Sequence, residues 1–480
     1  MGRFLAMMTL IDAIFMVPSL MIALVERDGQ ATFGFGWTIL IISAVSGIVL
    51  FVCRKARVRF YAREGMISVG VGWIIMSLIG ALPFWISQEI PQFLDAFFET
   101  VSGFTTTGAS ILTNVEGMSN SMLYWRSFTH WIGGMGVLVF LLAIVPASGK
   151  GSGFTMHLLR AESPGPNVGK LVPRMRETAM ILYILYMILT VLDIIFLLFG
   201  GMSVLEAVCT AFGTAGTGGF GLKNDSMAGY SPYIQNVCTV FMLLFGVNFS
   251  CYYMLFIGRI KDVFRDEELR FYVGMILGSI ILIAVNVRGM FASWEETFRH
   301  VAFQVATIIT TTGFATTNFD LWPTFSKTIL IILMFCGACA GSTGGGFKCG
   351  RVLLLFKSLN RNVHKTLNPQ KIKVVRNNGQ MISEKVLDNL HIYLIAYVFI
   401  MITSILVISL DGQSLTTTTT AVIACFNNIG PGFDAVGPVS NYHMFSPIAK
   451  LVLIFDMLAG RLEIFPILLL CARSTWKKLI

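Results

Sequence analysis

Charged residues are scarce in this chain of 480 residues: only 13% are Asp, Glu, Lys or Arg, whereas 55% are hydrophobic. A soluble protein of this length needs far more charged surface to stay in solution. In its place the sequence has repeated apolar runs of about 20 residues, each long enough to cross the ~30 Å hydrocarbon core of a bilayer. The scarcity of charge excludes an ordinary soluble fold and indicates an integral membrane protein.

Patterns typical of metal sites and enzymes are also missing. The 6 histidines are dispersed, and the 9 cysteines are scattered, mostly within apolar segments. Cys336 and Cys339 are close in the sequence, but no histidine accompanies them, so small packing residues are a better interpretation than a metal or redox site. The apolar runs contain no nucleophile with a matching base. We expect no enzymatic activity and no nucleic-acid partner.

The net charge of +9 is distributed unevenly between the two sides of the membrane. Basic clusters recur in alternate loops, at Arg54 to Arg59, at Arg174 with Arg176, and from Lys357 to Lys385, which we interpret as a solvated linker. By the positive-inside rule these loops and both termini are cytoplasmic. The intervening loops are net acidic, which would concentrate cations outside. We interpret the first apolar run as a retained span rather than a signal peptide.

Ten long apolar segments can be drawn along the chain. They cover approximately residues 4–25, 35–53, 66–87, 122–146, 179–200, 232–257, 271–288, 326–356, 390–410 and 445–472. The first two form a hairpin, and the other eight fall into four pairs. Each pair encloses an apolar stretch too short to span, followed by a loop rich in Thr and Gly. The short stretches are 93–103, 204–212, 298–309 and 418–426.

The four Thr/Gly-rich loops form an internal repeat. Aligned on Gly108, Gly218, Gly313 and Gly430, they are 110, 95 and 117 residues apart. One such loop would be weak evidence, but four in the same place between two spans decide the architecture. The sequence predicts an all-α membrane protein with four non-identical helix–pore loop–helix repeats around one pore. The predicted units are residues 1–63 (the N-terminal hairpin), 64–149, 150–262, 263–360 and 361–480 (the repeats).

This repeat is suited to cations. Non-helical backbone at membrane depth is tolerated only where it is buried in protein or lines water. Four short helices that end near the bilayer centre would direct the negative ends of their dipoles at one axis, which favours a cation there. Glycine lets the loops approach closely, and a ring of their oxygens can replace the hydration shell of a large ion. The alternative is that the loops are re-entrant packing elements or ordinary extracellular turns.

The predicted filter consists of each loop glycine and the two residues before it. These residues are Thr106, Thr107 and Gly108; Gly216, Thr217 and Gly218; Thr311, Thr312 and Gly313; and Asn428, Ile429 and Gly430. The loops carry no Arg or Lys, so an anion does not fit. Thr416 to Thr420 resemble filter threonines, but we expect them to open the fourth short helix instead.

A glycine-rich stretch interrupts the eighth apolar segment. Three consecutive glycines beside Ser-Thr should unwind a helix in its middle. We interpret this stretch as a flexible plug below the filter; small residues for close helix packing are the alternative. It is not a phosphate-binding loop, because the Gly-Lys-Ser/Thr ending is missing. The predicted gating residues are Gly341, Ser342, Thr343, Gly344, Gly345, Gly346 and Lys348, together with Arg461 in the last segment.

Arg461 carries a charge at membrane depth, which costs several kcal/mol unless the side chain faces water or a partner. Asp456 and Glu463 lie five residues before and two after it, which is not ideal same-face spacing on a helix. We favour a cation barrier on the pore axis over a side chain that reaches back to the cytoplasm. Asp193, alone in the fifth segment, is interpreted as structural.

Together these loops resemble the Trk/Ktr/HKT superfamily of potassium transporters, and most closely its bacterial TrkH-like members, over essentially the whole chain. The resemblance implies a filter glycine in each loop and a gating loop in the eighth segment. It further implies a homodimer in the bacterial inner membrane above a ring of cytosolic TrkA-like subunits that bind NAD(H) or ATP/ADP. Glycine rather than serine at Gly108 implies a preference for potassium. The second and fourth loops depart from Thr-Thr-Gly, so we expect some passage of rubidium, caesium or sodium.

We therefore predict gated, channel-like potassium uptake across the inner membrane. The only bound species expected on this chain is the potassium ion at the filter. Inward movement of a cation is favoured by about 2.3 kcal/mol per 100 mV, so accumulation needs no catalytic residues. The alternatives are a symporter coupled to protons or sodium, or a weakly selective channel for monovalent cations. A coupled transporter would favour inverted repeats and a buried acidic relay, whereas these repeats share one topology.

Overall fold

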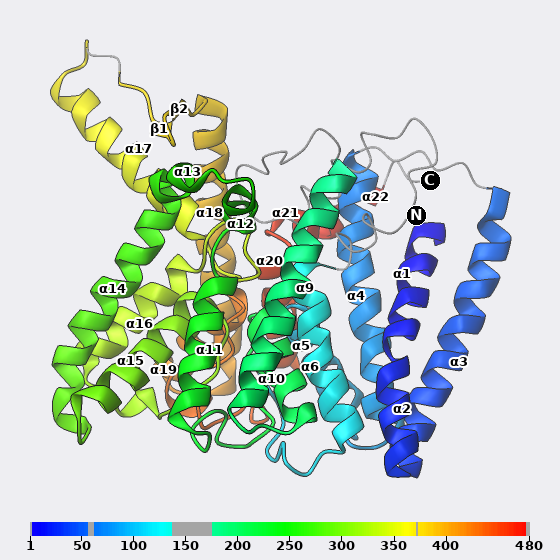
Figure 1. Cartoon of the computed structure of the whole chain (residues 1–480). Helices are drawn as coiled ribbons and strands as arrows, with labels where there is room; N and C mark the ends of the chain where they lie inside the picture. The colour runs from blue at the N-terminus through cyan, green and yellow to red at the C-terminus, as the bar shows by residue number, and fades with distance from the viewer. Residues whose placement is uncertain (1, 56–61, 137–174, 371–372, 477–480) are drawn as a thin grey trace.

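A computed structural model describes residues 2–55, 62–136, 175–370 and 373–476 of the chain, and these residues are mostly helical (Figure 1). The helices are α1 (Gly2–Phe15), α2 (Val17–Glu26), α3 (Gly29–Val52), α4 (Ala62–Ile86), α5 (Phe93–Phe104), α6 (Asn120–Met135), α9 (Met175–Phe199), α10 (Val204–Ala215), α11 (Pro232–Phe245), α12 (Phe249–Phe256), α13 (Ile260–Arg265), α14 (Glu267–Val287), α15 (Trp294–Ile309), α16 (Thr324–Cys336), α17 (Cys349–Leu367), α18 (Glu384–Ile408), α19 (Leu415–Phe426), α20 (Pro447–Arg461), α21 (Phe465–Cys471) and α22 (Arg473–Trp476). Two short antiparallel strands, β1 (Arg376–Asn377) and β2 (Gln380–Met381), form a hairpin.

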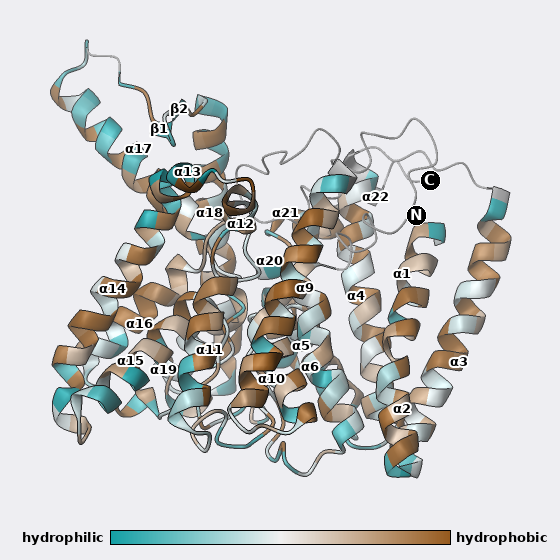
Figure 2. Ribbon diagram, in the orientation of Figure 1, coloured by the Kyte–Doolittle hydropathy of each residue, from teal (hydrophilic) through white to brown (hydrophobic). Residues whose placement is uncertain are grey.

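The outer surface of the bundle is apolar. Within the described ranges, 6 helical segments are long and apolar enough to cross a membrane, and α11 with α12 would make a seventh if the bent pair is one span. Side chains such as Leu40, Ile281 and Phe399 are exposed on these helices, and Figure 2 shows the hydrophobic colouring along them. Water would disfavour this much exposed apolar surface, so the protein is a multi-pass membrane protein. The exact number of ten spans stays a prediction.

α1 and α2 together form the first span, and α3 returns beside them to make the N-terminal hairpin. The turn between them is fixed by Asp28, the N-cap of α3, whose carboxylate accepts hydrogen bonds from the backbone N–H groups of Gln30 (3.0 Å) and Ala31 (3.1 Å). Both α1 and α3 pack on α4. The hairpin therefore lies on the outside of the first repeat (Figure 1).

The four short apolar stretches fold as α5, α10, α15 and α19, all in the same half of the bundle (Figure 1). The starts of α10, α15 and α19 are each set locally by the side chain of an N-cap serine. α10 has a capping box, in which Ser203 Oγ accepts from the Glu206 N–H and the Glu206 carboxylate accepts from the Ser203 N–H. Ser414 caps α19 through the Thr417 N–H, and the threonine run opens this helix as expected.

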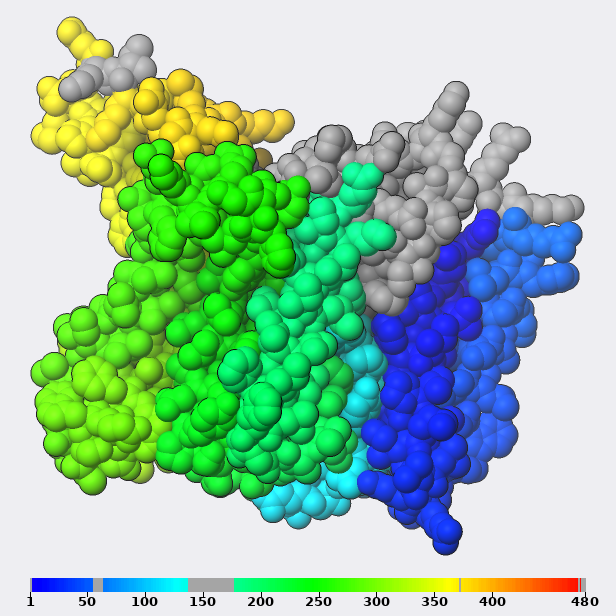
Figure 3. Space-filling model, in the orientation of Figure 1, coloured from blue at the N-terminus to red at the C-terminus, as the bar shows by residue number. Residues whose placement is uncertain are grey.

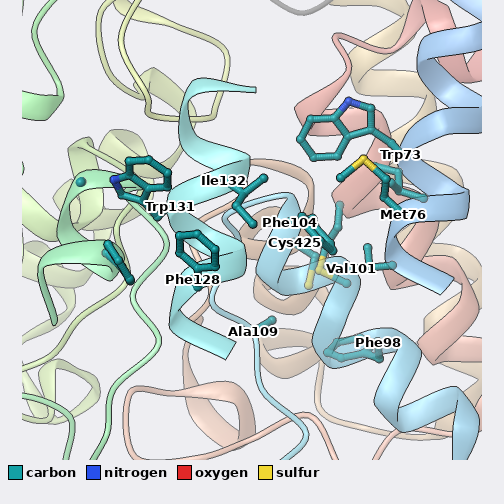
Figure 4. Close-up of a cluster of buried hydrophobic side chains, with 14 of the residues drawn as sticks. Trp73, Met76, Phe98, Val101, Phe104, Ala109, Phe128, Trp131, Ile132 and Cys425 are labelled. Carbon is teal, nitrogen blue, oxygen red and sulfur yellow. The ribbon is translucent and has the colours of Figure 1, made fainter. Parts of the chain in front are cut away.

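Aromatic packing holds the first short helix in place (Figure 4). Phe104 at the end of α5 meets the ring of Trp125 edge-on at 6.2 Å between centroids. Phe128 and Trp131 on α6 stack at 5.6 Å, and Phe212 of α10 packs against both. Such pairs stabilise a core beyond the area that they bury. They fix the spacing between the first and second repeats.

The helix after the second, third and fourth short helices is interrupted. α11 and α12 meet at 87°, α16 is followed by a loop before α17, and α20 is followed by a break before α21. The apolar segments 232–257 and 445–472 therefore each fold as two helices. In the first, Asn248 caps a new helix by accepting from the Ser250 N–H. In the second, Glu463 and Ile464 both have positive φ angles, which end α20.

The basic stretch 357–385 is only partly a linker. α17 continues through it to Leu367, and the β1–β2 hairpin follows. Both project from the bundle on the side where α1 begins and α22 lies (Figures 1 and 3). Residues 137–146 of the fourth apolar segment, together with Arg174, fall outside the described residues.

Candidate ion pathway: a ring of four glycine loops

The loops after the four short helices share one backbone geometry. In each, a residue with φ near +55° is followed two positions later by a glycine with positive φ. The first residues are Thr106 (φ 54°), Thr217 (52°), Thr311 (59°) and Asn428 (56°), and the glycines are Gly108 (76°), Gly219 (77°), Gly313 (90°) and Gly430 (94°). Left-handed backbone at a threonine or asparagine is disfavoured, so its fourfold recurrence marks a shared constraint rather than chance.

This geometry corrects the register of the second loop. The residue between the two left-handed positions donates its N–H to a carbonyl five residues earlier in every loop: Thr107 to Ser102, Gly218 to Gly213, Thr312 to Thr307 and Ile429 to Ala424, at 2.8 or 2.9 Å. Gly218 is therefore equivalent to Thr107, and Gly219 is equivalent to Gly108. The sequence alignment on Gly218 was wrong by one residue, because two consecutive glycines gave no basis for choosing between them.

The loops contact one another in a closed ring. A Cβ added at Gly108 would collide with the carbonyl oxygen of Gly218, one at Gly219 with that of Thr312, and one at Gly313 with that of Ile429. At Gly430 an added Cβ would lie 2.7 Å from the carbonyl oxygen of Thr107, which returns to the first loop. Each glycine thus lets its neighbour's main chain come close. The four loops surround one axis.

Buried polar contacts fix the first two loops behind the ring. The Glu99 carboxylate accepts hydrogen bonds from Arg126 Nε (2.6 Å) and from the backbone N–H of Ile111 (2.9 Å). Arg126 also donates to the carbonyl of Gly221 (3.0 Å), and its guanidinium lies 3.6 Å from the ring centroid of Phe220. Removal of one member of such a buried pair is strongly destabilising, because the other charge is left unpaired. This pair connects α5 and α6 to the second loop.

His130 explains why the second loop lacks a threonine. A Cβ at Gly218 would overlap the imidazole ring of His130, so the ring fills the space that the side chains of Thr107, Thr312 and Ile429 occupy in the other loops. His130 Nε2 accepts from the Phe220 N–H (3.3 Å), which leaves Nδ1 to donate to the carbonyl of Gly103 (2.8 Å). The histidine therefore joins the last turn of α5 to the second loop.

Asn428 takes a comparable role in the fourth loop. Its Nδ2 donates to Thr107 Oγ1 and to the carbonyl of Met457, both at 3.0 Å. Tyr442 donates to the carbonyl of Gly430 at 2.7 Å. The fourth loop is thus bound to the first loop and to α20 by side chains, whereas a threonine at this position would be too short to reach both. The loops share one backbone but have different supports.

The segment Gly337 to Lys348 folds as a loop against the ring, on the side where the short helices end. The Gly345 N–H donates to Thr311 Oγ1 at 2.6 Å. A Cβ at Gly344 would lie 2.8 Å from the carbonyl oxygen of Thr310. One at Gly345 would lie 2.7 Å from that of Asn427, so glycine is needed at both positions. The buried ammonium of Lys348 donates to the carbonyl of Gly344. The predicted break in the helix is confirmed at this position.

Arg461 bridges this loop to α6. Its guanidinium donates to the carbonyls of Thr343 (2.9 Å) and Gly134 (2.8 Å) and also to that of Gly133. Asp456 and Glu463 bind elsewhere: Asp456 accepts from Ser404 at 2.7 Å, and Glu463 pairs with Arg351 on α17. Arg461 is therefore placed next to the loop by main-chain acceptors.

A family model described as TrkH, cation transport protein, matches residues 29–478 of the chain. The chain belongs to the TrkH family. It is 35% identical over 466 residues to the Trk system potassium uptake protein TrkH of Salmonella typhimurium, which covers 95% of both chains. TrkH of Escherichia coli K12 is 35% identical over 470 residues, 96% of this chain and 95% of that one. The crystal structure of the potassium transporter TrkH from Vibrio parahaemolyticus matches with a TM-score of 0.87 at 29% identity and covers 99% of both chains.

The resemblance seen in the sequence is thus confirmed, and this TrkH-family chain is a transporter rather than an enzyme. Among the described residues no three His, Cys, Asp or Glu side chains come together as a metal site. Sequence reasoning missed His130, Tyr442 and the β1–β2 hairpin. The Asn378-Gly379 pair is a strong hairpin signal and could have revealed the last of these.

Proposed function

We propose that this TrkH-family chain takes up potassium through one pore lined by the four glycine loops. The relatives described above are potassium uptake proteins, and the ring of contacts between neighbouring loops is the observation that carries the proposal. Main-chain oxygens around one axis suit a weakly hydrated monovalent cation. The oxygens would come from the loop residues before each glycine, with Gly219 in place of Gly218 as the second filter glycine.

The gate, in this proposal, is the loop Gly337 to Lys348 together with Arg461. Two cationic side chains, Lys348 and Arg461, lie at this loop, and a positive charge on the path opposes the entry of a cation. The loop also contacts the filter through Gly345 and Thr311. Flux then requires that the loop move and that Arg461 release Thr343 or Gly134.

Uptake is driven by the membrane potential, and regulation comes from the cytosolic side. α17 carries Lys357, Arg361 and Lys365 and projects on the side where α1 begins (Figure 1), which fits a cytoplasmic orientation by the positive-inside rule. We propose that the chain works as a homodimer on a ring of TrkA-like subunits that bind NAD(H) or ATP/ADP, with both termini cytoplasmic in the bacterial inner membrane.

Uptake of tracer rubidium into proteoliposomes tests this function. We expect a negative internal potential to drive uptake, potassium to compete strongly, and sodium or lithium to compete weakly. Gly108→Ser should lower the preference for potassium over sodium, because the added side chain meets the Gly218 carbonyl. Gly278→Ala is the matched control, since a Cβ there meets nothing within 4 Å.

Two results would contradict the proposal. Equal competition by all three cations would favour a weakly selective channel. Uptake that fails at a clamped potential unless a sodium or proton gradient is imposed would favour the symporter.

A further inference from the structure

Three consecutive acidic residues, Asp266, Glu267 and Glu268, connect the surface hairpin with the loop that lies against the ring. They occupy the N-cap and first turn of α14. Asp266 caps its own helix by accepting from the Leu269 N–H at 2.8 Å. The remaining acceptors of the three carboxylates bind other elements, so the start of α14 is a junction rather than an ordinary helix end.

Glu268 holds the segment between α16 and α17 at two points. Its carboxylate accepts a hydrogen bond from the backbone N–H of Ala340 at 2.6 Å. The same carboxylate lies against Gly350, where an added Cβ would approach Oε1 to 2.8 Å. Ala340 lies within the loop, and Gly350 lies in the first turn of α17. One side chain therefore joins the two sides of the proposed gate.

Asp266 and Glu267 hold the β1–β2 hairpin. The side chain of Asn378 donates from Nδ2 to the Asp266 carboxylate (2.7 Å) and accepts at Oδ1 from the Glu267 N–H (2.9 Å). Lys357 of α17 pairs with the Glu267 carboxylate and donates to the carbonyl of Arg376 at 2.9 Å. Asn378 and Gly379 have φ angles of 48° and 76°, as a two-residue hairpin turn requires. The amide side chain that binds the start of α14 therefore belongs to a residue of the turn itself.

At its other end the loop reaches the filter, since the Gly345 N–H donates to Thr311 Oγ1 at 2.6 Å. Direct contacts thus run from Asn378 on the surface, through the start of α14, to the loop and the ring.

We propose that Glu268 is a positioning residue that keeps the loop against the filter, and that the hairpin acts on it through Asn378. This rests on the proposed role of the loop as a gate. Displacement of the hairpin removes the amide from Asp266 and Glu267, loosens the start of α14 and weakens the hold of Glu268 on Ala340. The closed state then loses a hydrogen bond that the open state does not need.

Rubidium uptake by matched variants tests the proposal. We expect Glu268→Ala to raise uptake on the order of tenfold, the shift typical for loss of a hydrogen bond to a charged acceptor. Glu268→Gln keeps an oxygen for Ala340 and should stay near the unaltered protein. Asn378→Ala should raise uptake less, and the control Gln380→Ala, an exposed position on the same hairpin, should have no effect.

Hydrogen–deuterium exchange on the full chain in lipid nanodiscs gives a second readout. Residues 337–350 should exchange faster in Glu268→Ala and Asn378→Ala but not in Glu268→Gln, while the short helices stay protected. In the double variant, residues 337–350 should exchange no faster than in Glu268→Ala alone, because both changes weaken the same contact between Glu268 and Ala340. Unchanged uptake and exchange in a folded Glu268→Ala, or equal effects of the Ala and Gln variants, would overturn the proposal. Failure of the unaltered protein to take up rubidium would instead refute the transport function. Hydrogen–deuterium exchange would still show whether Glu268 keeps the loop in place.

Discussion

The half of each repeat that contains the glycine loop keeps a common geometry, whereas the half that follows it differs among the second, third and fourth repeats. In the half that contains the glycine loops, the same two left-handed positions recur after α5, α10, α15 and α19, and the loops close into one ring. In the other half, α11 bends by 87° into α12, α16 gives way to a loop, and α20 breaks before α21. An ion on an axis needs oxygen ligands at similar distances on all sides, whereas a gate needs only one segment that moves. Symmetry is kept where the cation would bind and lost where flux would be controlled.

The common half keeps its geometry at an energetic cost. Each left-handed threonine or asparagine costs about 1 kcal/mol or more, and it persists only where its surroundings determine it. The supports that do so differ from loop to loop: Arg126 with Glu99, His130, and Asn428. Because the loops share one backbone geometry but are supported by different side chains, single substitutions can perturb the glycine-loop half or the following half separately.

The largest effect on uptake should come from a glycine of the ring. Gly313→Ala places a Cβ on the Ile429 carbonyl and strains a φ of 90°. We expect rubidium uptake to fall by about a hundredfold or more, since overlap and strain together cost a few kcal/mol. Uptake is measured in proteoliposomes at a fixed negative potential.

Gly278→Ala, in the lipid-exposed helix α14, is the matched control and should transport normally. Normal uptake by a correctly folded Gly313→Ala would mean that the ring is not the path of the ion.

The common half could be predicted from the sequence because its signals are local. Glycines at a regular spacing, short apolar stretches and the threonines before them gave the short helices and the ring with an error of one residue at Gly219. The other half depends on contacts between distant segments. Nothing within 232–257 shows that Asn248 would cap a new helix there, and the pairing of Glu463 with Arg351 joins residues far apart in the sequence. The gating role of Arg461 stays a prediction, and its acceptors are main-chain carbonyls, which sequence patterns do not reveal.

The next largest effect should come from the half that follows the glycine loops, and it should raise uptake rather than lower it. Arg461→Ala removes the hydrogen bonds to Thr343 and Gly134 and the positive charge beside the loop. We expect rubidium uptake to rise about tenfold, because charge-assisted hydrogen bonds of this kind contribute about 1.5–3 kcal/mol.

Arg461→Lys keeps the charge but cannot donate to the Thr343 and Gly134 carbonyls at once as a guanidinium does. Its rubidium uptake should lie between that of Arg461→Ala and that of the unaltered protein. Unchanged or lower uptake in a folded Arg461→Ala would remove Arg461 from the gate.

The smallest effect tests why the supports differ within the common half. In the unaltered protein, Gly218→Ala drives a Cβ into the His130 ring and should lower rubidium uptake about fivefold, as expected for an overpacked core site that costs about 1 kcal/mol. His130→Ala empties that space but also removes the hydrogen bonds to the Gly103 carbonyl and from the Phe220 N–H, so it should lower uptake by itself. In the His130→Ala background, Gly218→Ala should then have no further cost, and the difference between the two backgrounds measures the coupling. If Gly218→Ala reduced uptake equally in both backgrounds, the glycine would be required by the backbone of the second loop and not by the histidine behind it.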